Sequence, residues 1–215
     1  MELYLGIDGG GTTTRAILVE ASGRILGLGQ GGPSNYHNVG LEEAVRNIEV
    51  AHSAARADAG YPLDKVSGAF LGLAGIKSRG DTARVKAALE AVRLSPPEKI
   101  HVLNDLHNAH TGGLEAAPGI ALIAGTGTHC LGRDAAGQTF LCGGWGWFLD
   151  DRGGAFGLAA AALREAVRAA DKRGPETRLL EASLAFFGLS EAEEFLEHFY
   201  VHEWKPGRIA AFAPV

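Results

Sequence analysis

The sequence contains little cysteine, no long apolar run and no excess of positive charge. Its two cysteines, Cys130 and Cys142, are too few for a disulfide framework and lack the CxxC spacing of a metal site, so we expect two small buried or half-buried residues. With 20 Lys and Arg against 25 Asp and Glu, the net charge of −5 gives no electrostatic reason to expect nucleic acid or an anionic membrane as a partner. A small neutral or phosphorylated ligand is a better match.

The chain also lacks an apolar run long enough to span a bilayer, and its N-terminus enters a strand without a basic segment and cleavage site. A cytoplasmic location is therefore expected. The 215 residues suffice for one large domain or two small ones. Glycine is abundant, with 31 residues gathered in discrete clusters, and we expect a ligand to bind at those clusters.

The first cluster lies in LGIDGGGTTTR, residues 5–15. Apolar strand signals on both sides of the glycines and threonines predict a tight β-hairpin. The lysine of a P-loop is missing, and so is the helix that follows a P-loop or a dinucleotide-binding turn. In a hairpin, the glycine backbone can approach a polyphosphate, Thr12 and Thr13 offer hydroxyl donors, and Asp8 can hold a hydrated divalent cation. The alternative is an ordinary glycine-rich turn, which is disfavoured because three consecutive glycines weaken a hairpin.

The rest of the first half alternates strands and helices, which predicts an α/β domain with a mixed sheet. Strands are expected at residues 24–28, 66–73 and 100–103, and helices at residues 41–59 and 82–92. A polar loop is expected at residues 30–38, and its Asn35 carries an amide of the kind that hydrogen-bonds a sugar. The alternative is a surface loop without a ligand.

Asp105 follows a short apolar strand, at the carboxyl end where ligands of open α/β sheets bind. A carboxylate in that place can accept a proton from a hydroxyl group. The alternative is that Asp105 is the N-cap of the following helix, which carries His107, Asn108 and His110, because aspartate is favoured at N-caps. The local sequence leaves both interpretations open.

The second half repeats the opening pattern after Pro118-Gly119, which marks a boundary. Strands are expected at residues 120–124, 129–132 and 138–141, and helices at residues 155–170, 176–187, 191–200 with Ser190 as the cap, and from 208 onwards. Gly125-Thr126-Gly127-Thr128 joins the first two strands and supplies a second set of backbone donors for phosphate. Two such hairpins, one in each half, predict two similar domains that face each other across a cleft.

Residues 142–154, CGGWGWFLDDRGG, combine flexible backbone, aromatic faces and acidic groups. Trp145 or Trp147 can stack on a sugar ring, and Asp150 or Asp151 can hydrogen-bond its hydroxyls. The alternative is that both tryptophans belong to the core. It suits Trp147 better than Trp145, which stands between glycines.

Six segments carry a resemblance, in chain order LGIDGGGTTTRAILV, PSNYHN, LGLAG, LNDLHNAH, IALIAGTGTHC and CGGWGWFLDDRGGAFGLA. Together they resemble the N-acetylglucosamine kinase branch of the sugar-kinase superfold, in the family that also contains BadF/BcrA-type ATPase activators. The resemblance implies an α/β fold of two actin-like (ribonuclease H-like) domains with mixed sheets flanking a cleft, at residues 1–116 and 117–215. Family members continue past residue 215, so it also implies a second domain that is incomplete at the C-terminus and lacks the adenosine loop.

The same resemblance implies an ATP-dependent kinase acting on a hydroxyl of N-acetylglucosamine or a related hexose, with Mg²⁺. Asp105 matches the catalytic base, and Asp8 matches the acid that holds the Mg²⁺ shell. The residues that match the two ATP phosphate loops are Gly10, Gly11, Thr12 and Thr13 in the first and Gly125, Thr126 and Gly127 in the second. The residues that match sugar contacts are Asn35, Gly144, Trp145, Gly146 and Asp151.

The sequence departs from the family at Arg152, which stands in place of a glutamate, and at His129, which stands in place of an asparagine, and both leave the sugar open. Without the adenosine loop, the chain is expected to bind ATP poorly, and a homodimer is one way to cover the exposed apolar surface. Two alternatives stay open. One is an ATPase activator, whose iron–sulfur cluster needs cysteines in motif contexts that Cys130 and Cys142 do not occupy. The other is a non-catalytic sugar-binding relative.

Overall fold

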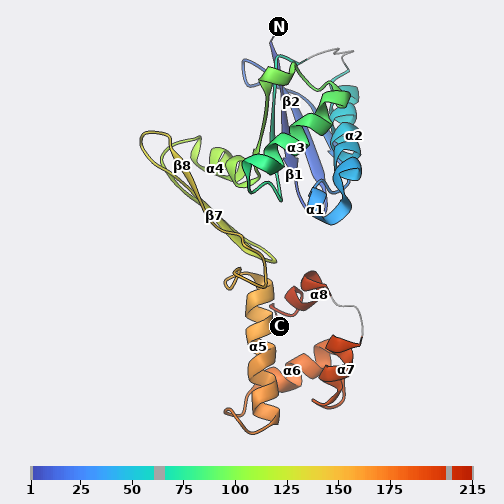
Figure 1. Ribbon diagram of the computed structural model, residues 1–215, viewed down its shortest axis with the longest axis vertical. Coiled ribbons are helices and arrows are strands. Elements are labelled where there is room, and N and C mark those ends of the chain that lie inside the picture. The colour runs from blue at the N-terminus through green and yellow to red at the C-terminus, as the bar shows by residue number, and fades with distance from the viewer. Residues whose placement is uncertain (1, 61–65, 202–204, 215) are drawn as a thin grey trace. The chain divides into compact units, whose positions relative to one another are not determined.

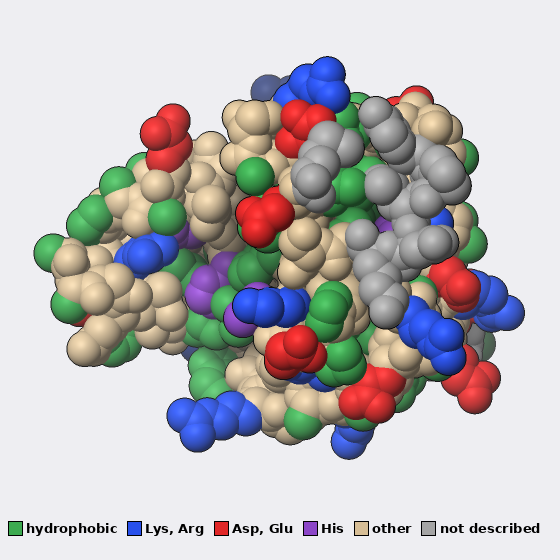
Figure 2. Space-filling model, turned by 90° about the horizontal axis from the view of Figure 1, so that it is seen from above, with side chains coloured by type: hydrophobic (Ala, Val, Ile, Leu, Met, Phe, Trp, Pro, Cys, Tyr) green, Lys and Arg blue, Asp and Glu red, His purple; other side chains and the backbone are tan. Residues whose placement is uncertain are grey.

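The computed structural model describes residues 2–60, 66–201 and 205–214. The chain divides into two compact units, residues 1–116 and 117–215 (Figure 1). None of the helices in the described ranges is long and apolar enough to cross a membrane. On the face seen in Figure 2, Lys and Arg side chains are interspersed with Asp and Glu over the described part of the chain, as the small net charge leads one to expect.

The first unit is built on a five-stranded sheet with the order β3-β2-β1-β4-β5. The strands are β1 Leu3–Gly9, β2 Thr14–Glu20, β3 Ile25–Gly31, β4 Gly68–Leu73 and β5 Ile100–Asn104. The sheet is mixed, because β1, β2 and β3 pair antiparallel whereas β1, β4 and β5 pair parallel. Along β1, Leu3, Leu5 and Ile7 are buried and alternate with less buried residues, so the period-two pattern of the sequence directs one face of the strand into the core.

The helices of the first unit are α1 Tyr36–Val39, α2 Leu41–Ala59, α3 Arg79–Leu89 and α4 Leu106–Leu114, with short 3₁₀ turns η1 Glu90–Val92 and η2 Pro97–Lys99. The longest helix, α2, packs closely on β3 because that strand presents glycines. A Cβ atom on Gly27 would lie 2.1 Å from the carbonyl oxygen of Ala55, and one on Gly29 would lie 2.0 Å from that of Ala51. The α2 backbone therefore rests directly on the strand, with Ile48 buried in the core.

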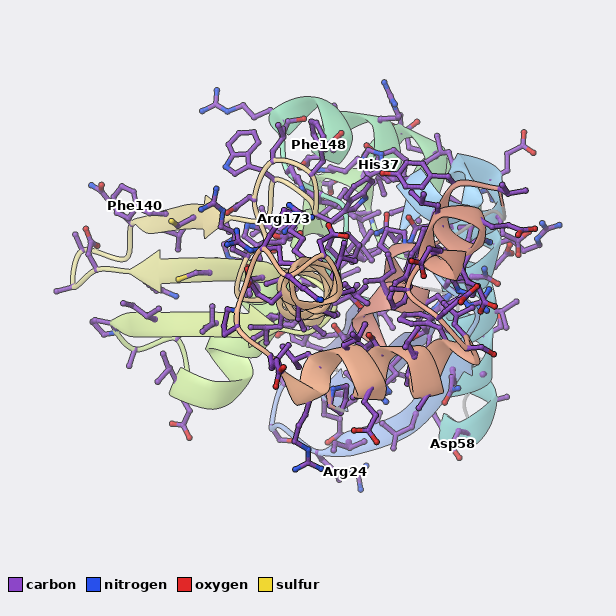
Figure 3. The ribbon with its side chains drawn as sticks, turned by 90° about the horizontal axis from the view of Figure 1, so that it is seen from below. Arg24, His37, Asp58, Phe140, Phe148 and Arg173 are labelled. Carbon is purple, nitrogen blue, oxygen red and sulfur yellow. The ribbon has the colours of Figure 1, made fainter. Side chains whose placement is uncertain are left out.

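The second unit has a three-stranded antiparallel sheet in the order β6-β7-β8, formed by β6 Gly119–Ala124, β7 Thr128–Arg133 and β8 Thr139–Gly143. Its helices are α5 Ala155–Ala170, α6 Arg178–Phe187, α7 Glu194–Tyr200 and α8 Pro206–Ala210. Phe156 on α5 packs with Ile209 and Phe212 in a small core. The sheet is far less covered, since Ile120 is 72% exposed, and Phe140, which stands off the edge strand β8 in Figure 3, is 60% exposed.

Most predicted elements are confirmed, and the helices at residues 41–59 and 155–170 match the structure in both bounds. Several expected bounds differ from the structure: β3 extends to Gly31, into the expected polar loop, and α8 ends at Ala210. Three further differences have a clear structural cause. Residues 36–39 form helix α1 and do not continue the polar loop, because Asn35 caps them. Helix α3 begins at Arg79, three residues before the predicted start, because Ser78 and Asp81 form a capping box.

Ser190 does not cap α7, which begins only at Glu194. Instead, the Ser190 backbone N–H donates to the Glu194 carboxylate at 2.8 Å. Both cysteines are free thiols, and Cys130 is half-buried as expected, whereas Cys142 is exposed because it lies on the open edge strand β8.

Candidate functional site

The first glycine-rich hairpin is a closed turn that also anchors the next loop. The Gly10 N–H donates to the Thr13 carbonyl at 2.9 Å, and the Gly10 carbonyl accepts from the N–H groups of Ser34 and Asn35 at 3.1 and 3.2 Å. Gly11 and Thr12 are exposed at the tip. Because the Gly10 N–H is engaged within the turn, the exposed tip is the part of this hairpin that is open to a ligand.

Two buried residues that the sequence did not single out fix this arrangement. The Thr14 hydroxyl, which is fully buried, lies 2.7 Å from both the Gly32 carbonyl and the Ser34 hydroxyl. A Cβ atom on Gly9 would lie 2.2 Å from the Ser34 hydroxyl oxygen, so a side chain there would push the loop away. Gly9 is therefore required for the loop that carries Asn35 to lie against the hairpin.

Asn35 serves as the N-cap of α1, where its Oδ1 atom accepts the His37 N–H at 3.2 Å. The same oxygen lies close to Gly75, and His37 Nε2 is 3.1 Å from the Gly75 carbonyl oxygen. Asn35 is half-buried, and its Nδ2 atom makes no hydrogen bond to the described residues. The loop thus holds the amide oxygen in a structural role and leaves the amide nitrogen for a ligand.

The α1 turn is tied to α3 by Tyr36, whose hydroxyl donates to the Asp81 carboxylate at 2.5 Å. This hydrogen bond is the largest of the effects that hold the pKa of Asp81 well below its usual range, and hydrogen bonds from Lys77 and Ser78 add to it. Burial and the contact with Asp81 raise the pKa of Tyr36. The pair is therefore an ionised carboxylate held by a neutral phenol.

Asp105 occupies the N-cap position of α4, but its side chain makes no capping hydrogen bond. The neighbouring Asn104 takes that part: its Oδ1 accepts the Leu106 N–H at 3.0 Å, while its Nδ2 donates to the Ile76 carbonyl at 2.9 Å. Asn104 is buried and Asp105 is half-buried. Asp105 therefore occupies the N-cap position, as one interpretation of the sequence expected. Its carboxylate, however, does not accept a capping hydrogen bond.

Asp8 stands at the carboxyl end of β1, exposed to solvent. Its Oδ1 atom accepts a hydrogen bond at 3.0 Å from Nδ2 of Asn108, which lies one helical turn after Asp105 on α4. Asp8 at the end of β1 is therefore linked through Asn108 to the first turn of α4, which follows Asp105 at the end of β5. Sequence reasoning placed Asn108 on the helix but did not pair it with Asp8.

In the second unit, the Gly125–Gly127 turn sits on the N-terminus of α5. The Gly125 N–H donates to the Gly127 carbonyl at 2.9 Å, and the first N–H groups of α5, those of Ala155 and Phe156, donate to the carbonyls of Gly125 and Thr126 at 2.8 and 3.0 Å. Gly125 and Thr126 are exposed. The turn is thus held from behind by a helix end, with its outer side open.

Asp151 is the member of the aromatic loop that contacts this turn. It is 8% exposed, lies in the left-handed region with a φ of 56°, and its Oδ1 atom accepts the Thr128 N–H at 3.2 Å. A Cβ atom on Gly127 would lie 2.4 Å from its Oδ2 atom. The Asp151 carboxylate therefore secures the loop to the second hairpin, which is a structural role that the sequence did not predict.

Both tryptophans of the loop are exposed, Trp145 by 71% and Trp147 by 45%, so the alternative that both belong to the core is wrong. Trp147 is the less exposed of the two because it packs on Phe156 at a ring distance of 5.3 Å. Gly144 is buried against His129, whose ring would lie 2.7 Å from a Cβ atom at that position, and Gly146 has a φ of 89°. Trp145 is thus presented to solvent by a backbone that needs its glycines.

The expected site residues fall into two groups. In the first unit, the structure describes Asp8, Gly10, Gly11, Thr12, Thr13, Asn35 and Asp105, and in the second unit Gly125, Thr126, Gly127, Gly144, Trp145, Gly146 and Asp151. No group of three or more His, Cys, Asp or Glu side chains among the described residues is arranged to hold a metal ion. A divalent cation at Asp8 would need other ligands, such as water and phosphate oxygens.

Comparison with known proteins gives relatives along most of the chain. The chain is 31% identical over 200 residues to the N-acetylmuramic acid/N-acetylglucosamine kinase of Clostridium acetobutylicum. It is also 31% identical over 208 residues to the N-acetyl-D-glucosamine kinase of Dictyostelium discoideum. Each match covers 93% of this chain and 65% of the relative, so the chain spans about two thirds of the length of these proteins.

Among solved structures, a Chromobacterium violaceum protein provisionally assigned as an N-acetylglucosamine kinase superposes with a TM-score of 0.78 at 24% identity, over 100% of this chain and 73% of that one. This likeness confirms the α/β fold. Residues 5–215 match the model of the BadF/BadG/BcrA/BcrD ATPase family. The chain therefore belongs to the BadF/BadG/BcrA/BcrD ATPase family.

Proposed function

We propose that the protein is an ATP-dependent kinase that transfers the γ-phosphoryl group to a hydroxyl of N-acetylglucosamine or a related amino sugar. The observation that carries the proposal is the position of the Asp105 carboxylate at the carboxyl end of β5. Asn104, and not Asp105, accepts the hydrogen bond from the Leu106 N–H at the start of α4. A carboxylate at the carboxyl end of a strand can orient a sugar hydroxyl and accept its proton. The named relatives, two N-acetylglucosamine kinases at 31% identity, support the same substrate class.

In this proposal the two hairpins bind the phosphates of ATP. The turn of Gly10, Gly11, Thr12 and Thr13 does so through its exposed tip at Gly11 and Thr12, and the turn of Gly125, Thr126 and Gly127 through its exposed outer side. Phosphoryl transfer needs mainly alignment and charge stabilisation, which backbone donors and hydroxyls supply. Asn35 offers its amide nitrogen to the sugar, and Trp145 offers an exposed ring face. Gly144 and Gly146 shape that loop, and Asp151 holds it to the second hairpin.

The residues present suit Mg²⁺ that arrives with the nucleotide. Asp8 supplies a single exposed carboxylate, and Mg²⁺ in kinases is commonly held by one or two carboxylates together with phosphate oxygens and water. When bound, Mg²⁺ would neutralise charge on the phosphates during transfer. The role of the chain is then to hold Asp8 in one orientation beside the first hairpin.

We further infer that residues 1–116 and 117–215 are two actin-like domains flanking a cleft, and that the second domain lacks part of its cover. The exposure of Ile120, Leu122 and Phe140 on the three-stranded sheet supports this inference. A further segment of polypeptide or a homodimer would bury such side chains. A cytoplasmic location, with ATP and a sugar as small-molecule partners, completes the proposal.

The test is calorimetric titration of the chain with a magnesium complex of a non-hydrolysable ATP analogue, with and without N-acetylglucosamine, followed by ³¹P detection of the sugar phosphate with ATP. We expect nucleotide binding that is weak without sugar and that sugar strengthens, and a phosphorylated sugar. Sugar binding without nucleotide binding or product would refute the kinase proposal and favour the non-catalytic sugar-binding alternative.

A further inference from the structure

The side-chain amide of Asn108 on α4 contacts three hydrogen-bond acceptors. Its Nδ2 atom lies 3.0 Å from Asp8 Oδ1, 3.2 Å from the Ile7 carbonyl oxygen and 3.3 Å from the Gly72 carbonyl oxygen. All three partners are acceptors, so the nitrogen and not the oxygen of the amide must face them. Two amide hydrogens serve three acceptors, which requires one hydrogen to be shared.

The sheet makes room for this amide at Gly72. In the register of the sheet, Asp8 on β1 is opposite Gly72 on β4. A Cβ atom on Gly72 would lie 2.3 to 2.4 Å from the Nδ2, Cγ and Oδ1 atoms of Asn108. Any side chain at this buried position would therefore expel the amide, and the glycine lets the amide rest on the carboxyl ends of two neighbouring strands.

These contacts join three parts of the candidate site. Through the Ile7 and Gly72 carbonyls, Asn108 fixes the start of α4 to β1 and β4, and α4 begins directly after Asp105. Through Oδ1 it also fixes the rotation of the Asp8 carboxylate. One amide thus sets the orientation of Asp8 and the distance between Asp8 and the helix turn that carries Asp105.

We propose that Asn108 is a positioning residue for the metal–nucleotide site: it holds the Asp8 carboxylate through one oxygen so that the carboxylate meets the hydrated cation in a single orientation. The inference rests on the proposed function. It is not a claim that Asn108 touches the metal or the substrate. Hydrogen-bonding partners of metal-binding carboxylates typically change metal affinity by about 10- to 100-fold when they are removed.

The test compares Asn108→Ala with the matched control Asn47→Ala. Asn47 is also half-buried in the first unit, and its Nδ2 donates to the Pro33 carbonyl at 2.8 Å, without contact to Asp8. Binding of Mn²⁺, used in place of Mg²⁺, is followed by electron paramagnetic resonance in the presence of ADP. Sugar phosphorylation is measured separately at several Mg²⁺ concentrations, and circular dichroism checks that both variants fold.

We expect Asn108→Ala to weaken Mn²⁺ binding by about 10-fold or more, and Asn47→Ala to leave it unchanged. Equal affinities in wild type and Asn108→Ala, an equal loss in both variants, or no Mn²⁺ binding to the wild type would each overturn the inference. If Asn108→Ala does not fold, Asn108→Leu, which keeps the branched shape and removes the donors, replaces it.

A measurement on the wild-type protein adds a check that depends on no variant. When Mg²⁺ and ADP are added, the side-chain amide signals of Asn108 in a ¹H–¹⁵N spectrum should shift, whereas those of Asn47 should not. The two proposals can fail separately. If Mn²⁺ binding depends on Asn108 but no sugar is phosphorylated, the kinase proposal is refuted and the inference about Asn108 stands. If sugar is phosphorylated but Mn²⁺ binding does not depend on Asn108, the inference is refuted and the kinase proposal stands.

Discussion

The hydrogen bond between Tyr36 and Asp81 should make the first unit measurably dependent on pH. Tyr36→Phe removes a phenol that donates at 2.5 Å to an ionised carboxylate and leaves the bonds from Ser78 and Lys77 in place. Hydrogen bonds to charged groups contribute about 1.5–3 kcal/mol. Because Asp81 is partly exposed, solvent screens it, and we expect a loss near the lower end, about 1.5 kcal/mol at pH 7.

The direction of the pH dependence follows from the lowered pKa of Asp81. A carboxyl group whose pKa is lower in the folded state stabilises the fold at pH values above its unfolded pKa of about 4, and this stabilisation is lost as the pH falls towards the folded pKa. The unfolded chains of wild type and Tyr36→Phe titrate alike at Asp81, so the free-energy difference between the two proteins should be constant from pH 7 to about pH 5. It should shrink only when the pH falls through the folded pKa of Asp81 in the variant, which lies below about 4 because the bonds from Lys77 and Ser78 remain.

Urea unfolding followed by circular dichroism at a series of pH values measures this difference. Tyr4→Phe is the matched control, because Tyr4 lies in the same unit and its hydroxyl donates to the exposed Glu2 carboxylate at 3.2 Å. We expect the control to change stability by less than about 0.5 kcal/mol. A Tyr36→Phe variant as stable as the wild type at pH 7, or a difference that grows as the pH falls from 5 to 3, would refute the reasoning.

Two further predictions concern groups outside the site. Burial, with a smaller effect from Arg56, lowers the pKa of His52 in the folded protein. As the pH falls, His52 is therefore protonated in the unfolded chain before it is protonated in the folded one, and wild-type stability should fall below about pH 6.5. His52→Leu should lose this part of the acid sensitivity in urea unfolding at pH 7.5 and 5.5, and an unchanged pH dependence would contradict it. Cys130 is opposite Cys142 in the β7–β8 register, and both are free thiols. Oxidised glutathione should link them within one chain and release two reduced glutathione molecules, and a mass spectrum with two unlinked thiols would count against this register.

The parts of the fold that the sequence predicts well are those that local pattern decides. Helix α2 carries its apolar residues at helical spacing and ends at Gly60, which adopts the left-handed conformation, so both ends were predictable. Both glycine-rich hairpins lie between clear strand signals. The start of α7 was missed because Ser190 has the sequence signature of a cap while its backbone, and not its side chain, bonds to Glu194.

The site was predictable in its residues and not in their partners. Asp8 and Asn108 are separated by 100 residues, and only the parallel pairing of β1, β4 and β5 brings them together. Likewise, Asp151 contacts Thr128 only because its backbone takes a left-handed conformation, which no local signal indicates for an aspartate between Asp150 and Arg152. The sequence therefore predicted Asp8 and Asp151 as ligand-binding residues, but only the three-dimensional structure shows which residues they hydrogen-bond.

The most direct test of the central claim is sugar phosphorylation by Asp105→Asn in the full-length protein, with sugar affinity measured in parallel by calorimetry. If Asp105 is the base that accepts the hydroxyl proton, kcat should fall by about 100-fold or more. The affinity for N-acetylglucosamine should stay within a few-fold, and the fold should be unchanged because asparagine keeps the size and shape of the aspartate side chain. An Asp105→Asn protein that phosphorylates the sugar at the wild-type rate would contradict the account.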